Sequence, residues 1–168
     1  MVLRLRAAIC GVGIVLLCSS AAMARAEIGS GHSPAIDRAA FVRPIVGTAS
    51  MYNPFRPGYR GGGGQTSSGE RYDPHAWTAA IQIKLRGIFG GIHHRRTAGY
   101  ALIESMSKRA IVKINDVGPL EPGRIIDFNE RTMRYFDPTL QRGLIRNVKV
   151  TPLHGAGWTA GPVAKGAV

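Results

Sequence analysis

The acidic side chains of this 168-residue chain are few, and their positions separate structural carboxylates from candidates for catalysis. The sequence holds ten Asp and Glu residues against 22 Lys and Arg. Four of the ten have positions that a tail, a helix start or a turn explains: Glu27, Asp37, Glu130 and Asp137. Three others stand beside glycine-rich loops: Glu70, Asp116 and Asp127. Carboxylates at strand ends beside such loops are typical of glycosidic chemistry, in which one carboxyl group protonates the leaving oxygen.

Each of the three candidate carboxylates also has a plainer interpretation. Asp116 ends an apolar run just before a Gly-Pro pair, where it can simply anchor a turn. Asp127 can accept backbone hydrogen bonds or pair with Arg124, a contact of little energetic weight at a surface. Glu70 follows a Ser-Gly turn that does not need a carboxylate after it. Glu70 is therefore the strongest of the three candidates.

Short apolar runs between frequent Gly and Pro residues must position these carboxylates. Five runs are strand-like: Ile45 to Tyr52, Tyr100 to Ser105, Ala110 to Asn115, Ile125 to Phe128 and Arg146 to Leu153. This pattern is typical of a compact, mainly β barrel or sandwich. Two short helices are expected between strands, one that begins at Pro74 with Asp73 as its cap, and one over Glu130 to Phe136 with Asn129 as its cap.

The first 26 residues have the features of a secretory signal peptide. Two arginines precede an apolar stretch over residues 7–17 that is too short to cross a bilayer. Ala24 and Ala26 place small residues at the cleavage positions, so the mature chain is expected to begin at Glu27. A leucine before Cys18 disfavours lipid attachment at that cysteine. We therefore expect an exported protein of the periplasm or cell envelope, without a lipid anchor.

Cleavage of that signal leaves 142 of the 168 residues, enough for one domain with a core. Both cysteines, Cys10 and Cys18, lie within the signal, so the mature chain has neither a disulfide nor a thiolate metal site. The expected organisation is a flexible segment over residues 27–43, a folded domain over residues 44–153 and a flexible tail over residues 154–168.

The chain is strongly basic. Its formal net charge of +12 falls to +9 on cleavage, because three arginines and no carboxylate leave with the signal. Outside the cytoplasm this charge favours peptidoglycan carboxylates and other anionic envelope polymers as partners. Nucleic acid is not expected, because export removes it and because the aromatic residues do not interleave with the basic ones. We expect the mature protein to be a monomer.

Five ordered segments resemble the motifs of one known family. They are residues 47–52 (GTASMY), 66–73 (TSSGERYD), 77–80 (WTAA), 115–119 (NDVGP) and 123–127 (GRIID). In order and spacing they are similar to the motifs of rare lipoprotein A, the septal ring lytic transglycosylase. The resemblance covers residues 45 to 153. It implies a six-stranded double-psi β-barrel, a fold that expansins share.

The resemblance also implies an activity and a set of site residues. The family cleaves the β-1,4 bond between N-acetylmuramic acid and N-acetylglucosamine in peptidoglycan glycan strands, without water, and leaves a 1,6-anhydro end. By matched position, Glu70 and Asp116 correspond to its catalytic carboxylates. Four further residues are expected at the substrate: Asp127, Asn115, Tyr52 and Tyr72. No metal or other cofactor is expected, because the C6 hydroxyl of the sugar replaces the attacking water.

The chain departs from the family pattern in three places. The histidine that usually follows Thr-Ala-Ala is Ile81, the arginine that usually follows Asn-Asp is Val117, and a loop with the sequence HHRR at residues 93–96 is inserted. His75 or a histidine of the inserted loop is a candidate for the missing imidazole. If Ile81 has weakened the site, Ile81→His should raise activity. Three hypotheses follow: an endolytic transglycosylase with full, reduced or absent activity, a non-catalytic expansin-like wall-binding module, and a hydrolase that uses water.

Overall fold

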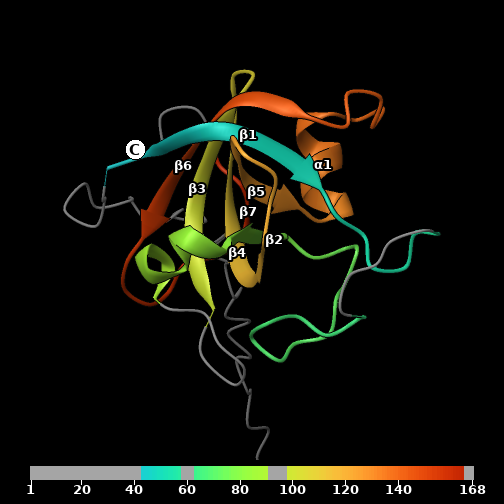
Figure 1. The fold of residues 1–168 in the computed structure, drawn as a ribbon. Coiled ribbons are helices and arrows are strands. Elements are labelled where there is room, and N and C mark those ends of the chain that lie inside the picture. Colours follow the sequence, from blue (N-terminus) through green and yellow to red (C-terminus); the bar gives the residue numbers. More distant parts are fainter. Residues whose placement is uncertain (1–42, 58–62, 91–97, 165–168) are drawn as a thin grey trace, which may run out of the picture. The chain divides into compact units, whose positions relative to one another are not determined.

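The computed structural model describes residues 43–57, 63–90 and 98–164 (Figure 1). In chain order its elements are β1 (Ile45–Met51), β2 (Thr78–Gln82), the 3-10 helix η2 (Ile83–Phe89), β3 (Gly99–Ser105), β4 (Lys108–Gly118), β5 (Arg124–Phe128), α1 (Glu130–Phe136), β6 (Ile145–Leu153) and β7 (Gly161–Pro162). The predicted signal peptide lies outside the described residues, and so do all but Arg43 of the N-terminal segment.

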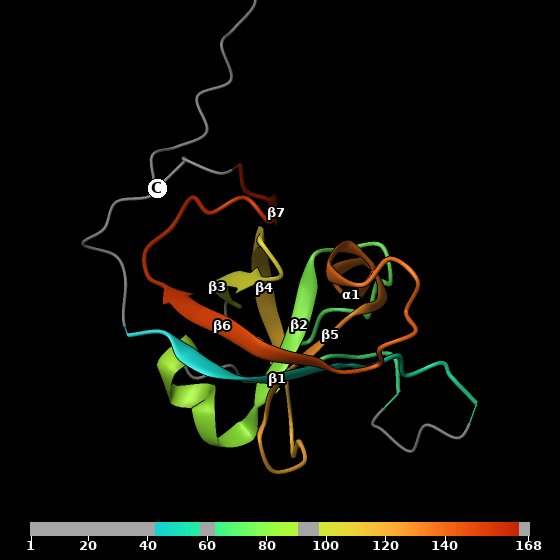
Figure 2. The same ribbon diagram turned by 90° about the horizontal axis from the view of Figure 1, so that it is seen from above.

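Six of the strands close into a barrel (Figure 1 and Figure 2). They run in the order β2-β5-β1-β6-β3-β4, and a further pairing between β2 and β4 joins the two ends of this series. The β1–β5 and β2–β4 pairs are parallel, whereas the other pairs are antiparallel. The mixed, closed, six-stranded sheet confirms the expected mainly β fold, a double-psi β-barrel with two short helices.

The inward-pointing side chains form one apolar core. Because side chains alternate along a strand, every second residue faces this core. Ala49 of β1 and Ile126 and Phe128 of β5 are fully buried in it together with residues of the other barrel strands. Helix α1 adds Met133 and Phe136, and the Phe136 ring stacks on Phe128 with the ring centroids 5.5 Å apart. The residues between the inward ones face outward, and these build the candidate site.

One of the two predicted helices is confirmed and the other was placed wrongly. Asn129 caps α1 by accepting a hydrogen bond from the Thr132 backbone N–H at 3.0 Å. Asp73 accepts from the His75 backbone N–H at 2.8 Å, but this closes only a turn, because β2 begins at Thr78 and leaves no length for a helix. The second helix is instead η2, where the Gln82 side chain accepts from the Lys84 N–H at 2.9 Å.

The five predicted strands are present, and two further strands, β2 and β7, were not predicted. β7 lies in the segment expected to be a flexible tail and pairs with β4 through Ala110–Pro162 and Ile111–Gly161. Trp158 of the same segment packs against the small cluster of Leu102, Ile111 and Leu153. The described part of this tail is therefore attached to the barrel. Within the described residues, no helix has the length and hydrophobicity needed to cross a membrane.

Candidate functional site

The site begins with a row of residues across four neighbouring strands. Ala80 in β2 is the register partner of Asp116 in β4 on one side and of Asp127 in β5 on the other. Asp127 in turn pairs with Ser50 in β1. The chain neighbours of Ser50, Ala80 and Asp127 belong to the core or pack against it, so the row itself lies on the outer face of the barrel. Two of the three predicted carboxylates are thus brought to one face, on either side of Ala80.

Glu70 reaches this face from the loop between β1 and β2. Lys113 forms a hydrogen-bonded ion pair with Glu70 Oε1, and Asn115 Nδ2 donates to Oε2 at 3.0 Å. The backbone of a tight turn fixes the position of Glu70, since the Thr66 N–H donates to the Glu70 carbonyl at 2.8 Å and the Gly69 N–H donates to the Thr66 carbonyl at 2.9 Å. Gly69 has a φ of 93°, a conformation that favours glycine.

The surroundings of Glu70 favour its ionised form. Partial burial alone would raise the pKa of Glu70, because desolvation disfavours the carboxylate. The hydrogen bonds from Lys113 and Asn115, together with the positive charge of Lys113, act in the opposite direction and outweigh burial. The pKa of Glu70 is therefore held below its ordinary value, and this side chain is a carboxylate at neutral pH.

Asp116 ties the Glu70 loop to β4. Its Oδ1 accepts from the Ser67 backbone N–H at 2.9 Å, from the Ser67 hydroxyl at 2.6 Å and from the Val117 N–H at 2.9 Å. The Ser68 N–H adds a backbone bond to the carbonyl of Asn115 at 3.0 Å. No donor in the described part of the chain bonds to Asp116 Oδ2. The predicted pair of Glu70 and Asp116 is thus connected by Ser67 on one side and by Asn115 on the other.

Asp127 has different surroundings. It is half-buried, and Ser50 donates its hydroxyl hydrogen to Asp127 Oδ1. Burial raises the pKa of Asp127, and neither the hydrogen bond from Ser50 nor the positive charge of Arg124 fully offsets this effect. The pKa of Asp127 lies above its ordinary value, opposite in direction to that of Glu70. The face therefore holds one carboxyl group whose surroundings favour the charged form and one whose surroundings favour the proton.

The two predicted sugar-contacting tyrosines are buried. Tyr52 and Tyr72 are 6% and 7% exposed, and they form a small cluster with Ala80. Their rings pack edge to face with the centroids 5.2 Å apart, and the Tyr72 hydroxyl donates to the Tyr52 carbonyl at 3.1 Å. Asn115 is also buried. These three side chains support the site from beneath, and a direct contact with sugar stays a prediction for each.

Ile81 lies on the other side of the sheet from the carboxylates. It is fully buried in the core and is the register partner of Val117 and Ile126. A histidine at position 81 would therefore enter the core rather than the row of carboxylates, and the effect of Ile81→His on activity stays a prediction. His75 lies in the turn before β2, and His93 and His94 lie outside the described residues. No described histidine bonds to Glu70, Asp116 or Asp127.

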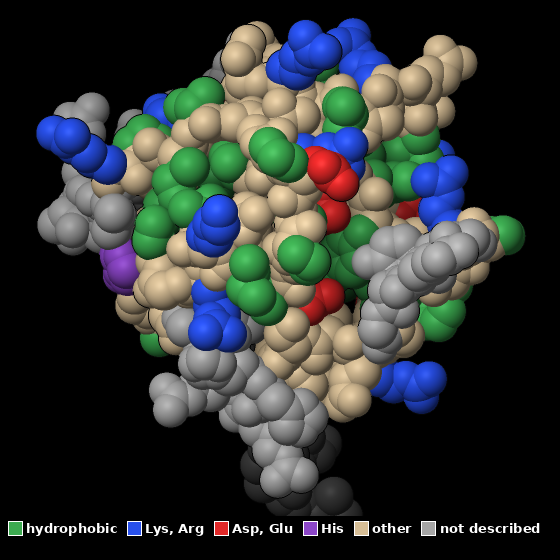
Figure 3. Space-filling model, in the orientation of Figure 1, with side chains coloured by type: hydrophobic (Ala, Val, Ile, Leu, Met, Phe, Trp, Pro, Cys, Tyr) green, Lys and Arg blue, Asp and Glu red, His purple; other side chains and the backbone are tan. Residues whose placement is uncertain are grey.

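The outer surface carries few acidic side chains among many basic ones. Figure 3 shows carboxylates on one face with Lys and Arg side chains around them. In the described part of the chain, no group of three or more His, Cys, Asp and Glu side chains is placed to hold a metal ion. The arrangement offers acid–base chemistry by carboxyl groups, with Lys113 as the adjacent positive charge.

Comparison with known proteins adds a family. A model of the lytic transglycolase family matches residues 45–150, which span all six barrel strands except the end of β6. No curated protein matches the chain. Among solved structures, a Streptomyces papain inhibitor is similar with 14% sequence identity and a TM-score of 0.49, over 68% of this chain and 97% of that one.

Proposed function

Because this chain belongs to the lytic transglycolase family, we propose that it is a peptidoglycan lytic transglycosylase that cleaves the MurNAc–GlcNAc β-1,4 bond within glycan strands. The observation that carries the proposal is the pairing of Glu70 and Asp116 on one outward-facing patch, joined by Ser67 and Asn115. Enzymes that cleave glycosidic bonds use two such carboxyl groups. Here the two come from different segments, and side-chain hydrogen bonds that a purely structural turn would not need hold them in place.

Glu70 is the base of the proposed reaction. A base must receive the proton of the C6 hydroxyl while that oxygen attacks C1 of the same sugar, and only an ionised carboxylate can do so. The lowered pKa of Glu70 keeps it ionised at neutral pH. Its negative charge also stabilises the oxocarbenium-like transition state. The C1–O4 bond breaks, the new C1–O6 bond forms, and the product is the 1,6-anhydro sugar.

Asp116 is the proton donor for the leaving O4 oxygen. Its Oδ1 accepts hydrogen bonds from three donors, so Oδ2, which no described donor contacts, is the oxygen available to O4. Fixed geometry matters because a general acid must lie within hydrogen-bond reach of the oxygen that it protonates. Asp127, whose pKa is raised by burial, contacts a sugar hydroxyl through its carboxyl group in this proposal.

The location and partners follow from the sequence and the proposed substrate. We propose that the signal peptide directs the chain to the periplasm or cell envelope, where it is cleaved before Glu27 and remains without lipid. The glycan strands of peptidoglycan are the substrate there. The high positive charge adds a general attraction to wall carboxylates and other anionic polymers, which salt would screen.

A non-catalytic wall-binding module is the second candidate, and one observation favours it. The family histidine is replaced by Ile81, which is buried in the core, and no described histidine bonds to the carboxylates. If an imidazole is required for turnover, the same face would bind glycan without cleaving it. Lys113, Glu70 and Asn115 would then act as hydrogen-bonding groups for sugar hydroxyls.

Digestion of purified sacculi, followed by mass analysis of the soluble fragments, tests the proposal. The transglycosylase should release 1,6-anhydromuramyl fragments, and Glu70→Gln should not. Reducing-end fragments would instead identify a hydrolase. Retention on sacculi with no soluble fragment would support the binding module and contradict the enzyme.

A further inference from the structure

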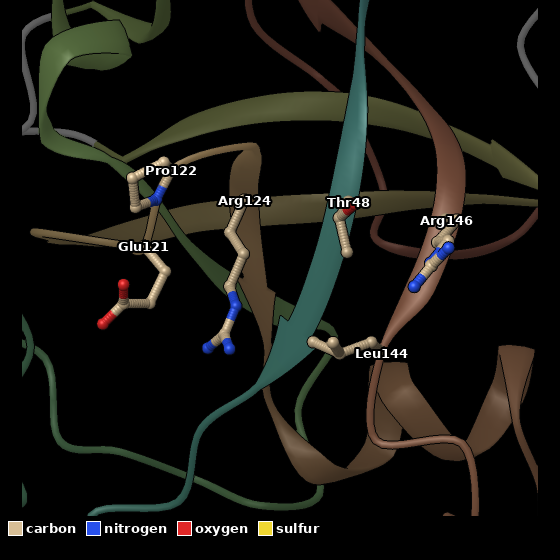
Figure 4. A pocket seen from close by; sticks show the side chains of 6 residues that line it. All are labelled: Thr48, Glu121, Pro122, Arg124, Leu144 and Arg146. Atoms are coloured by element: carbon tan, nitrogen blue, oxygen red, sulfur yellow. The ribbon is translucent and has the colours of Figure 1, made fainter.

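A pocket with basic side chains surrounds Thr48 of β1. This Thr48 pocket has a volume of about 630 Å³ and six lining residues: Thr48, Glu121, Pro122, Arg124, Leu144 and Arg146. Figure 4 shows Arg124 of β5 and Arg146 of β6 on either side of Thr48. None of the three candidate carboxylates of the outer face lines this pocket, so it is a feature separate from the carboxylate row.

Two irregularities in the strand pairing bring these arginines to Thr48. The register between β1 and β5 shifts directly after the Thr48–Arg124 pair. The register between β1 and β6 shifts at Thr48 as well, and there Asn147 of β6 has a φ of 56°. A β-bulge adds one residue to a strand and redirects a side chain. Each register shift lies beside Thr48, and each contributes one arginine to the pocket.

The Thr48 pocket continues into two further pockets across β6. Leu144 and Arg146 also line a second pocket of about 420 Å³, to which Met106 and Arg142 contribute. Met106 lies in the turn between β3 and β4, and it also lines a third pocket of about 370 Å³, together with Lys149 of β6. These shared residues connect the three pockets into one groove, which we call the basic groove. It runs from β5 and β1, across the start of β6, to the β3–β4 hairpin.

The basic groove holds more positive than negative side chains. Two acidic residues line it, Glu104 and Glu121, against six basic ones: Lys108, Arg109, Arg124, Arg142, Arg146 and Lys149. At the hairpin end the charges are already paired, because Glu104 contacts Arg109 at 3.3 Å and Lys149 at 2.9 Å. Elsewhere they are not.

Three arginines of the groove are available to an external anion. Within the described residues, no ion pair involves Arg124, Arg142 or Arg146. Arg124 is half-buried, and the other two are exposed. Arg146 lines both the Thr48 pocket and the second pocket, so it joins the sites of Arg124 and Arg142. A chain with several anionic groups therefore fits the groove better than a single small anion does.

The side chains of the groove distinguish among anionic polymers. A guanidinium group donates parallel hydrogen bonds to phosphate or carboxylate oxygens. Phosphate oxygens point in tetrahedral directions, so one phosphate group can accept from arginines on opposite sides, as Arg124 and Arg146 lie about Thr48. No aromatic residue is among the described residues that line the groove, so it has no stacking platform for nucleotide bases. A groove also suits a linear chain better than the flat surface of a lipid bilayer.

We propose that the basic groove binds a linear phosphodiester polymer of the cell envelope, of the poly(glycerol phosphate) type, through Arg124, Arg142 and Arg146. Once one phosphate of the chain is bound, the next ones are held at a high effective concentration beside the other arginines. A polymer bound there leaves the carboxylate row open to glycan. The groove thus retains the protein in the envelope by a contact that does not depend on glycan cleavage.

Binding of a fluorescently labelled poly(glycerol phosphate) oligomer, measured by anisotropy in the absence of glycan, tests this inference. Arg146→Gln should weaken binding by about tenfold or more, because it removes charge-assisted hydrogen bonds from two pockets. Arg124→Gln and Arg142→Gln should each weaken it by about three- to tenfold. Each substitution should also reduce the slope of log affinity against log salt by about 0.7, the contribution of one phosphate contact on a single chain.

Arg86→Gln in η2 is the matched control, since it removes the same charge outside the groove and should leave the affinity nearly unchanged. Equal losses with Arg86→Gln and Arg146→Gln would overturn the inference, because binding would then reflect net charge alone. So would the absence of binding at low salt.

Three other anionic ligands check the chemical class of the polymer. Polygalacturonate, single-stranded DNA with the same number of charges, and anionic lipid vesicles should each bind no more tightly than the oligomer. Tighter binding of any of them would overturn the phosphodiester assignment. The assay contains no glycan, so its outcome is independent of whether the protein cleaves peptidoglycan.

Discussion

Glu70 and Asp127 are carboxyl groups on one face of the barrel, but their surroundings change their pKa values in opposite directions. The carboxylate of Glu70 is paired with Lys113 and Asn115, and its pKa is lowered. Asp127 is more buried, Ser50 is its one hydrogen-bond donor within the described residues, and its pKa is raised. The residue type therefore does not determine the role. Opposite surroundings thus move the pKa values of two carboxyl groups on a single protein face apart.

The largest expected effect comes from removal of the titrating groups. Glu70→Gln and Asp116→Asn should each lower the rate of glycan cleavage by roughly a hundredfold or more, as the loss of general acid–base catalysis does. Asp127→Asn should lower it by less than about tenfold, because an amide can still donate a hydrogen bond to the sugar. Initial rates of anhydro-end formation measure all three. A larger loss with Asp127→Asn than with Asp116→Asn would transfer the proton-donor role to Asp127.

The next largest effect concerns Ile81, whose side chain lies on the inner side of β2. Ile81→His should lower the free energy of unfolding by about 2–4 kcal/mol, because it removes apolar packing and buries an imidazole with no polar partner. It should not increase the cleavage rate. Thermal unfolding and the cleavage assay measure the two outcomes, with the volume-conserving Ile81→Leu as the control. A stable and more active Ile81→His variant would contradict the core position of this side chain.

The smallest expected effect is a difference between Glu70 and Asp127 in how each side chain changes the stability of the fold with pH. The pKa of Glu70 is lower in the folded state than in the unfolded state. Ionised Glu70 therefore stabilises the fold at pH values above its unfolded pKa, and this stabilisation is lost as the pH falls through its folded-state pKa. For Asp127 the pH dependence of stability has the opposite sign, because the folded state holds the proton more tightly than the unfolded state does. The stability of the fold therefore falls as the pH rises through the raised pKa of Asp127. Relative to wild type, Glu70→Gln should therefore lose Tm at neutral pH and Asp127→Asn should gain it.

Melting curves at neutral and at acidic pH check this comparison. Both differences should shrink at a pH below both pKa values, where the wild-type side chains are protonated. Differences of the same sign for the two variants at neutral pH would show that their surroundings are not opposite. Thr139→Ala, which removes a hydroxyl at a different carboxylate, Asp137, is a control for general effects of lost side-chain bonds.

Local patterns in the sequence were sufficient for some elements and not for others. The alternation in β1 and the Asn129 cap of α1 are local signals, and both elements are present. β2 has the sequence TAAIQ, which is weak in β-forming residues, and it is a strand because β4 and β5 pair with it on both sides. The same pairing begins so soon after Pro74 that the predicted helix there has no room.

The candidate site was also predictable only in part. The order of the motifs predicted Glu70 and Asp116, but the hydrogen bonds that connect them, through Ser67 and Asn115, link segments far apart in the chain. Lys113 was not predicted, because a lysine inside a strand has no local signal for an ion pair. The Thr48 pocket was also missed, since its two arginines depend on register shifts that only paired strands reveal.

Digestion of sacculi in oxygen-18-labelled water tests the central claim most directly. If Glu70 takes the proton of the C6 hydroxyl, the new ends are 1,6-anhydro sugars that carry no label, and Glu70→Gln abolishes them. Labelled reducing ends would show that water attacks C1 and would contradict the transglycosylase. The absence of any new ends, with the protein folded and bound to the sacculi, would contradict catalysis altogether.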